Sequence, residues 1–167
     1  MQHRLQGRTD IPLNDIGIQM AIDARELYKA VHFDVCYCSP LSRAKRTAEI
    51  LLQYRNIPII PDERLVEMGF GIYEGKAEEP DCPVNIIFQH PEQYTASVGG
   101  AESFEELYAR TGDFLKNTVA PLLQSQKDVL IIGHGAMNSC IICQVQNKPL
   151  KDFWSTGIEN CKLIRLL

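Results

Sequence analysis

Residues 33–51, FDVCYCSPLSRAKRTAEIL, change from a strand pattern to a helix pattern across a single Ser-Pro step. Cys36 and Cys38 are two positions apart and therefore point to one face of the strand, where free thiols pack as small apolar groups. Ser39 and Pro40 are typical of a helix start, as the N-cap and the first helical residue. A strand that leads directly into a helix is a common unit of α/β proteins.

The alternation of strands and helices continues on both sides of this step. Further strands are expected near residues 57–60, 128–132 and 161–166, and helices after Asn14, after Ser103 and over 137–145. Residues 65–98 are rich in Gly and Pro, which predicts a loop region that covers a site rather than building a core. We therefore expect one α/β domain over residues 1–167, with a mainly parallel sheet between two layers of helices.

The composition excludes several classes of function. The chain is 45% hydrophobic and 23% charged, with a formal net charge of -4, and it has no Lys/Arg stripe for nucleic acid. Its apolar runs are too short for a membrane span, and no signal peptide is visible. Cys140 and Cys143 form a C-x-x-C, but no second ligand pair accompanies them, so no metal site is predicted. A reduced, cytoplasmic protein is the simplest interpretation of the six cysteines.

Two polar side chains follow strands at the edge where open α/β sheets bind ligands. Arg43 lies in the first turn of the helix after the first strand, where a guanidinium can hold phosphate oxygens in a bidentate way. His134 follows an apolar run and stands between Gly133 and Gly135, which allow a sharp turn and the close approach of a ligand. From position alone, a solvated arginine and a structural histidine remain ordinary alternatives.

A carboxyl group precedes a glycine-rich run in the loop region. Glu67 comes before Gly69 and Gly71, and a carboxyl that is partly desolvated beside a phosphate can have its pKa raised enough to donate a proton. An exposed loop carboxylate is the commoner fate of Glu on composition alone. Glu74, in the same stretch, is the weaker candidate for an acid.

Four blocks in fixed order resemble the histidine phosphatase superfamily, the phosphoglycerate-mutase-like family. These blocks are HRLQGRTDIPLN (3–14), SPLSRAKRTA (39–48), LVEMGFGIYEGK (65–76) and VLIIGHG (129–135). The resemblance implies a phosphoglycerate-mutase-like fold and a phosphomonoester hydrolase that acts on a small phosphorylated substrate. It implies no metal and no other cofactor, because a histidine takes the phosphoryl group and the protein supplies the charges that stabilise it.

The resemblance also assigns roles to residues. Arg43 and His134 match groups that stabilise the transferring phosphoryl oxygens, and Glu67 matches the group that protonates the leaving oxygen. Gln6 and Gly7 match the loop that contacts substrate. Arg4, near the mouth of the site, and Gly135, beside His134, complete the candidate substrate contacts, and Gly99 to Ser103 resembles a turn that caps the following helix.

The family's nucleophilic histidine stands in an Arg-His-Gly motif that ends a first strand, and the printed sequence begins just after the place of this motif. His3 does not match it, because it ends no apolar strand and no glycine follows. We therefore expect a chain truncated at its amino terminus and nearly inactive as printed. The missing strand is expected at the centre of the sheet, between strands 33–38 and 128–132, with its gap closed by a partner chain in a homodimer, by rearranged pairing or by a bound anion.

Two other functions stay open. A phosphoglycerate mutase is one, although the interval between Glu67 and His134 is short and has few basic residues, which favours a phosphatase. A catalytically dead protein that binds a phosphorylated ligand is the other.

Overall fold

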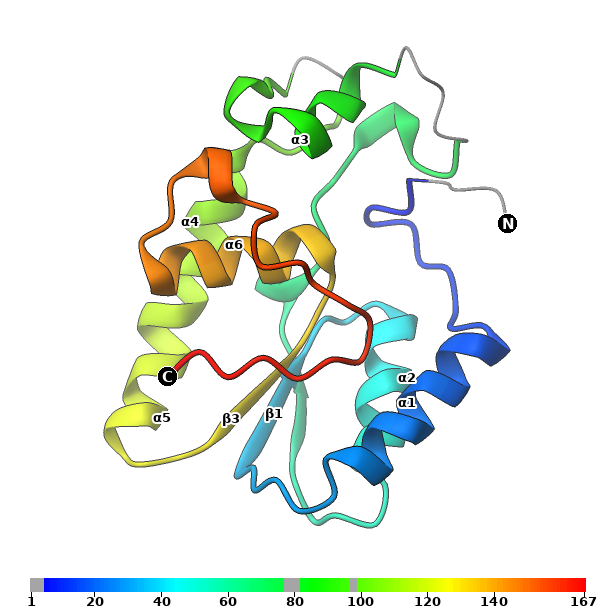
Figure 1. The fold of residues 1–167 in the computed structure, drawn as a ribbon, viewed down its shortest axis with the longest axis vertical. Coiled ribbons are helices and arrows are strands. Elements are labelled where there is room, and N and C mark those ends of the chain that lie inside the picture. Colours follow the sequence, from blue (N-terminus) through cyan, green and yellow to red (C-terminus); the bar gives the residue numbers. More distant parts are fainter. Residues whose placement is uncertain (1–4, 77–81, 97–98) are drawn as a thin grey trace.

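The computed structural model describes residues 5–76, 82–96 and 99–167 (Figure 1). Three strands, β1 (Val35–Cys38), β2 (Ile59–Pro61) and β3 (Val129–Ile132), form a parallel sheet in the order β2-β1-β3. Parallel strands need crossover connections, and helices provide these here, as the alternating sequence pattern predicts.

The helices begin close to their expected positions. They are α1 (Asp15–Leu27), α2 (Ser42–Leu51), α3 (Ile86–Gln89), α4 (Phe104–Phe114), α5 (Ala120–Gln124) and α6 (Gly135–Gln146), with a π-helical stretch (Leu115–Val119) between α4 and α5. Asn14 caps α1 by accepting from the Gly17 amide, and Ser103 caps α4 in a capping box with Glu106. In the part of the chain that the structure describes, no helix is long and apolar enough to cross a membrane.

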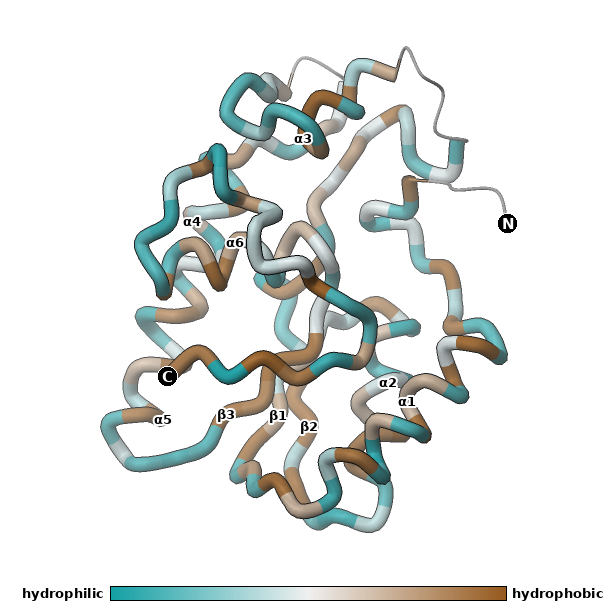
Figure 2. Tube along the Cα trace, in the orientation of Figure 1, coloured by the Kyte–Doolittle hydropathy of each residue, from teal (hydrophilic) through white to brown (hydrophobic). Residues whose placement is uncertain are grey.

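The two faces of the sheet bury different side chains, which gives three layers. Cys36 and Cys38 of β1 pack with Ala48 of α2, and Tyr37 on the opposite face packs with Phe114 of α4. Figure 1 accordingly shows α1 and α2 on one side of the strands and α4 and α6 on the other, and Figure 2 shows the strands as mainly hydrophobic. The expected α/β class with a parallel sheet between helices is confirmed.

No open gap lies between the two strands that were expected to flank a missing one, and their direct pairing is one of the three expected ways to close it. β1 pairs directly with β3 over four residues, from Val35 opposite Val129 to Cys38 opposite Ile132. These backbone groups bond to one another, so no further strand fits between them. Among the described strands, β3 has one unpaired edge, and a further strand could pair with it there.

The expected strand at 161–166 is not formed either. Cys161 has a left-handed φ of +57°, and the residues after it pair with no strand. Leu163 and Leu166 still pack against the core clusters on the two faces, and the Leu163 amide donates to the Tyr28 hydroxyl at 3.0 Å. The expected strand is therefore wrong, and its apolar side chains are half-buried without strand pairing among the described residues.

The glycine- and proline-rich region contributes to a hydrophobic core cluster, contrary to expectation. Met68, Val84 and Ile87 are fully buried in one cluster with Phe104 of α4 and Phe153. A 3-10 turn (Pro83–Asn85) carries Val84 inward and α3 carries Ile87, whereas Met68 lies in the irregular stretch before Gly69.

Candidate active site

Arg43 lies in the first turn of α2, but the helix begins later than the Ser-Pro step predicts. Its first residue is Ser42, whose amide and hydroxyl both donate to Asp10 Oδ1, at 2.8 and 2.7 Å. Ser39 and Pro40 lie before the helix, and the Asp10 carboxylate takes over the capping role from another part of the chain. This contact joins the amino-terminal loop to α2 next to Arg43.

The guanidinium of Arg43 fixes this loop as well. Nη1 donates to the Thr9 carbonyl at 2.9 Å and Nη2 to the Gly7 carbonyl at 2.8 Å. A guanidinium has five N–H groups, so these two bonds hold its plane and leave three for a ligand. Burial lowers the pKa of Arg43, and the negative charge of Glu67 opposes this effect.

Gly7 takes part through its backbone. Its φ is +52°, and a Cβ at this position would lie 2.3 Å from Glu74 Oε1. Glu74 accepts from the Thr9 amide and hydroxyl, both at 2.8 Å, and from the Phe70 amide at 3.0 Å, so its role is to hold the loop. Gln6 is exposed beside this turn, and Arg4 lies outside the described residues.

The Glu67 carboxylate is held by backbone amides. It accepts from Met68 at 2.8 Å, and from Met137 and Ala136 in the first turn of α6, at 3.0 and 3.3 Å. Burial raises the pKa of Glu67 above its ordinary value, although these amides and Arg43 lower it. A carboxyl whose pKa is raised holds its proton more readily than an ordinary glutamate, as a proton donor must.

His134 is the N-cap of α6, directly beyond the end of β3. Its Nε2 atom is buried and has no hydrogen-bond partner among the described residues. Burial, with the positive charges of Arg43 and Arg110, lowers the pKa of His134 to about 3, so the imidazole is neutral at pH 7. A buried polar atom without a partner costs about 1–3 kcal/mol, and such atoms are found where ligands bind. Gly135 is exposed beside it, and a Cβ there would lie 3.8 Å from Glu67 Oε2.

Two further charged residues at the site escaped the sequence analysis. Glu102 is buried and accepts from Arg110 Nε at 2.7 Å and Arg110 Nη2 at 3.0 Å, and from Arg8 Nη2 at 2.8 Å. Ser103 next to it does cap α4, as expected, but capping is only part of the role of this turn. No local pattern signals this cluster, because Glu102 lies before α4 and Arg8 comes from a distant part of the chain.

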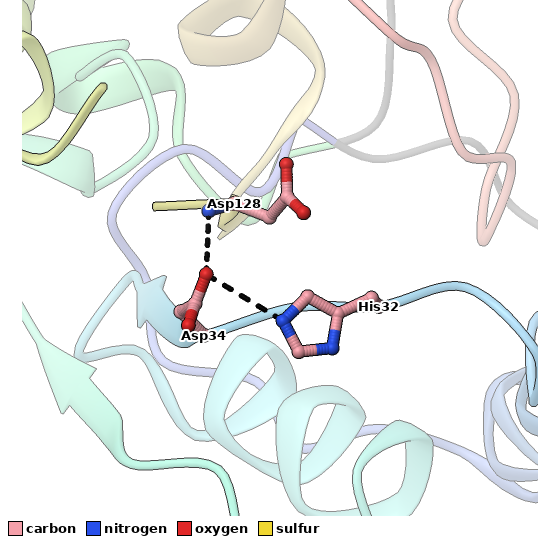
Figure 3. A group of neighbouring side chains, drawn as sticks. All are labelled: His32, Asp34 and Asp128. Carbon is pink, nitrogen blue, oxygen red and sulfur yellow. Dashed lines mark hydrogen bonds and ion pairs between the residues drawn. The ribbon is translucent and has the colours of Figure 1, made fainter. Parts of the chain in front are cut away.

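A second polar cluster lies at the other end of the sheet, before β1 and β3. Figure 3 shows His32, Asp34 and Asp128, whose ligand atoms lie within 4.8 Å of one another. Asp34 Oδ1 already accepts from Lys127 Nζ at 2.9 Å, and Oδ2 accepts from the Asp128 amide at 2.8 Å. The ammonium group of Lys127 already neutralises Asp34, as a bound cation would. This cluster therefore holds together the loops that precede β1 and β3.

Comparison with known proteins identifies the family. Residues 1–167 match the sequence profile of the histidine phosphatase superfamily, branch 1. The chain belongs to this superfamily. It is 33% identical over 165 residues to the Bacillus subtilis protein named Uncharacterized phosphatase PhoE, over 98% of this chain and 79% of that one. It is 27% identical to the 2,3-bisphosphoglycerate-dependent phosphoglycerate mutase 2 of Gloeobacter violaceus, over 96% of this chain and 76% of that one.

The fold of this histidine phosphatase superfamily member is shared with solved structures. Bacillus stearothermophilus YhfR superposes with a TM-score of 0.78 at 29% identity, covering 91% of this chain and 76% of that one. The family resemblance of the four sequence blocks is thus confirmed. In space, the blocks bring together Arg43, Glu67 and His134, with Gly7 and Gly135 beside them.

Proposed function

We propose that this member of the histidine phosphatase superfamily is a phosphomonoester hydrolase that acts through a phosphohistidine intermediate. The observation that carries the proposal is the position of the Glu67 carboxyl. It rests on the first amides of α6, directly after His134, and interacts with the charge of Arg43. An acid beside a cation and a neutral imidazole fits a reaction in which a phosphate ester loses its alcohol.

The chemistry follows from these groups. Arg43 and the unpartnered Nε2 of His134 bind phosphoryl oxygens, and a second histidine attacks phosphorus as the bond to the leaving oxygen breaks. Glu67 gives its proton to that oxygen and becomes a carboxylate. It then takes a proton from the water that attacks the phosphohistidine, which releases inorganic phosphate and restores both residues.

The nucleophile belongs to a segment outside the described residues. His32 and His90 are exposed and away from the site. Among the described residues, His134 is the histidine that lies at the site. We propose that the nucleophilic histidine ends a strand at the unpaired edge of β3, since β1 occupies the other edge and β3 leads directly to His134. A chain that lacks such a segment is expected to be nearly inactive.

A phosphatase is favoured over a mutase by charge. A phosphoglycerate carries a carboxylate as well as its phosphate, so a mutase must supply cations for both. The interval between Glu67 and His134 has few basic residues, and Arg110 among them is already paired with Glu102. The higher identity to a phosphatase than to a mutase agrees with this proposal.

We also propose that the protein works in the cytoplasm on a small phosphorylated metabolite. All six cysteines are free thiols and five of them are buried, which suits a reducing compartment. The formal net charge of -4 does not favour nucleic acid as a substrate.

The substitution Glu67→Gln tests the proposal in the protein expressed from its natural reading frame. We expect kcat/KM to fall by about 10²-fold or more for an alkyl phosphate, whose leaving oxygen needs a proton. For 4-nitrophenyl phosphate, which leaves without one, we expect a fall of less than about tenfold. Glu63→Gln, an exposed change four residues away, is the control. Equal losses on both esters would remove Glu67 from the acid role, and an inert parent protein would favour the binding function.

A further inference from the structure

We propose that Glu102 is a positioning residue for proton donation, and that it acts on Glu67 through Arg8 and Arg110. The inference rests on the proposed acid role of Glu67. Neither the resemblance nor the helix-capping pattern assigned any part in the reaction to Glu102, which touches no reacting group itself.

The two arginines connect the carboxylate of Glu102 to the backbone of the acid. Arg8 Nε and Arg110 Nη2 each donate to the Glu67 carbonyl at 3.3 Å, and both guanidiniums also donate to Glu102. Arg110 Nη1 additionally donates to the Arg64 carbonyl at 2.6 Å, which ties α4 to the same segment. Two cations from separate parts of the chain therefore meet on one carbonyl, and one carboxylate holds both of them.

A direct backbone link completes the arrangement. The Glu102 amide donates to the Gly69 carbonyl at 2.9 Å, and the Gly69 amide donates to Glu102 Oε2 at 3.3 Å. Glu102 thus holds Gly69 directly and the Glu67 carbonyl through the two arginines, while the side chain of Glu67 is fixed by the amides of α6. A carboxyl held at its backbone and at its oxygens has little freedom to leave its position.

Burial explains why a carboxylate is required at this place. The side chain of Glu102 is 5% exposed, against 16% for Arg110 and 47% for Arg8. Removing the charge of Glu102 leaves the guanidinium of Arg110 without its buried partner, and a charge left unpaired in this way is unfavourable. The guanidinium is then expected to turn toward water and to release the Glu67 carbonyl.

Several charges face Glu67, and the test must separate them. Arg43 of α2 acts on its carboxyl directly, and His134 of α6 lies beside it. The negative charges of Asp10 and Glu74 act in turn on Arg43. Glu102, Arg8 and Arg110 lie on the side of the Glu67 backbone. The experiment therefore has to distinguish a displacement of the Glu67 carboxyl from a general change of charge at the site.

The experiment compares Glu102→Gln with Glu106→Ala, a control that breaks the capping box of the same helix; among the described residues Glu106 bonds to Ser103, and it acts on Arg8 only through its charge. We measure kcat and KM for an alkyl phosphate and for 4-nitrophenyl phosphate in the protein expressed from its natural reading frame. For Glu102→Gln we expect kcat on the alkyl ester to fall by about tenfold to a hundredfold, because a displacement of about 1 Å can cost that much. We expect little change on the aryl ester, and equal effects on both esters for Glu106→Ala.

A double variant tests whether Glu102 acts through Glu67. If it does, Glu67→Gln combined with Glu102→Gln loses no more activity on the alkyl ester than Glu67→Gln alone. If Glu102→Gln does not fold, Arg8→Met replaces it, because Arg8 is half exposed and makes one of the two contacts to the Glu67 carbonyl.

The outcomes separate this inference from the function on which it rests. Two results would overturn the positioning role alone. In the first, Glu67→Gln lowers activity selectively on the alkyl ester, but Glu102→Gln lowers it equally on both esters. In the second, the activity losses of the two substitutions add in the double variant. A Glu67→Gln variant that lacks selectivity would remove the acid role, and the positioning role with it.

Discussion

The imidazole of His134 has a buried Nε2 with no hydrogen-bond partner among the described residues, and the charges of two guanidiniums act on it. Its charged form is disfavoured by burial first and by Arg43 and Arg110 second. A neutral imidazole adds no charge to the site before the substrate arrives, and its ring nitrogen can still bind a phosphoryl oxygen. The same burial has a consequence for folding that can be measured without any substrate.

We predict that His134 makes the protein less stable as the pH falls below about 6.5. Its pKa is about 3 in the folded chain and near 6.5 in the unfolded chain. Between these values the unfolded state binds a proton that the folded state does not, so the free energy of unfolding decreases as the pH falls through this window. Above the window the contribution is constant.

Urea unfolding of the wild type and of His134→Gln from pH 4 to pH 8 checks this prediction. The difference between the two proteins is expected to change with pH below 6.5 in favour of the variant, and to be flat above it. His90→Gln is the matched control, because His90 is exposed. A pH-independent difference for His134→Gln would show that the imidazole titrates normally in the folded chain.

Single residues differ in how much of their role the sequence could reveal. Arg43, Glu67 and His134 each follow a strand or begin a glycine-rich turn, and the structure brings them together. Glu102 and Arg110 could not be assigned, because their role depends on the carbonyl of Glu67, a contact between segments that no local pattern describes. Gln6 is placed beside the site but exposed, so its expected substrate contact stays a prediction.

The start of α2 shows the same limit for a whole element. Ser39-Pro40 is an ordinary helix-start signal, yet the Ser39 amide donates to the Ile132 carbonyl and the helix begins at Ser42. The cap comes from Asp10, 32 residues earlier in the chain. Local propensity therefore identified the helix, and a distant side chain determined its first residue.

We predict that Asp10→Ala weakens both the helix start and anion binding. The Ser42 amide and hydroxyl lose their acceptor, so the urea midpoint of unfolding is expected to fall as for the loss of an ordinary helix cap. The affinity for inorganic phosphate should fall as well, because Arg43 loses the loop that fixes its guanidinium.

Ser42→Ala is the control, since it removes the hydroxyl and keeps the amide bond to Asp10. Calorimetric titration with phosphate measures the affinity. A full loss of stability with unchanged phosphate affinity in Asp10→Ala would show that the loop does not position Arg43.

The whole sheet shows what a hydrophobic pattern leaves undetermined. Strands 33–38, 57–60 and 128–132 were expected, and β1, β2 and β3 lie within or next to them. Their order was not readable, because burial on both faces looks the same in a central and in an edge strand. The placement of a further strand between β1 and β3 came from the resemblance, and in this chain the two strands pair directly with each other.

We predict that residues 1–167 alone turn over phosphomonoesters very slowly. Loss of a nucleophile costs on the order of a million-fold in turnover in other hydrolases, and the groups described here stabilise charge without attacking phosphorus. Assays of this chain and of the protein from its natural reading frame, side by side with 4-nitrophenyl phosphate, make the comparison. Comparable rates would show that the described segments, or residues 1–4, contain the nucleophile.

Trapping the covalent intermediate tests phosphoryl transfer at this site most directly. The protein from its natural reading frame is mixed with an excess of a labelled alkyl phosphate, quenched within milliseconds, and analysed by mass spectrometry for the modified residue. We predict one phosphoryl group per chain on a histidine nitrogen, stable to alkali and labile to acid, with Arg43→Ala lowering its rate of formation. Turnover without any phosphohistidine, or a phosphoryl group on an aspartate or a serine, would contradict the proposed mechanism.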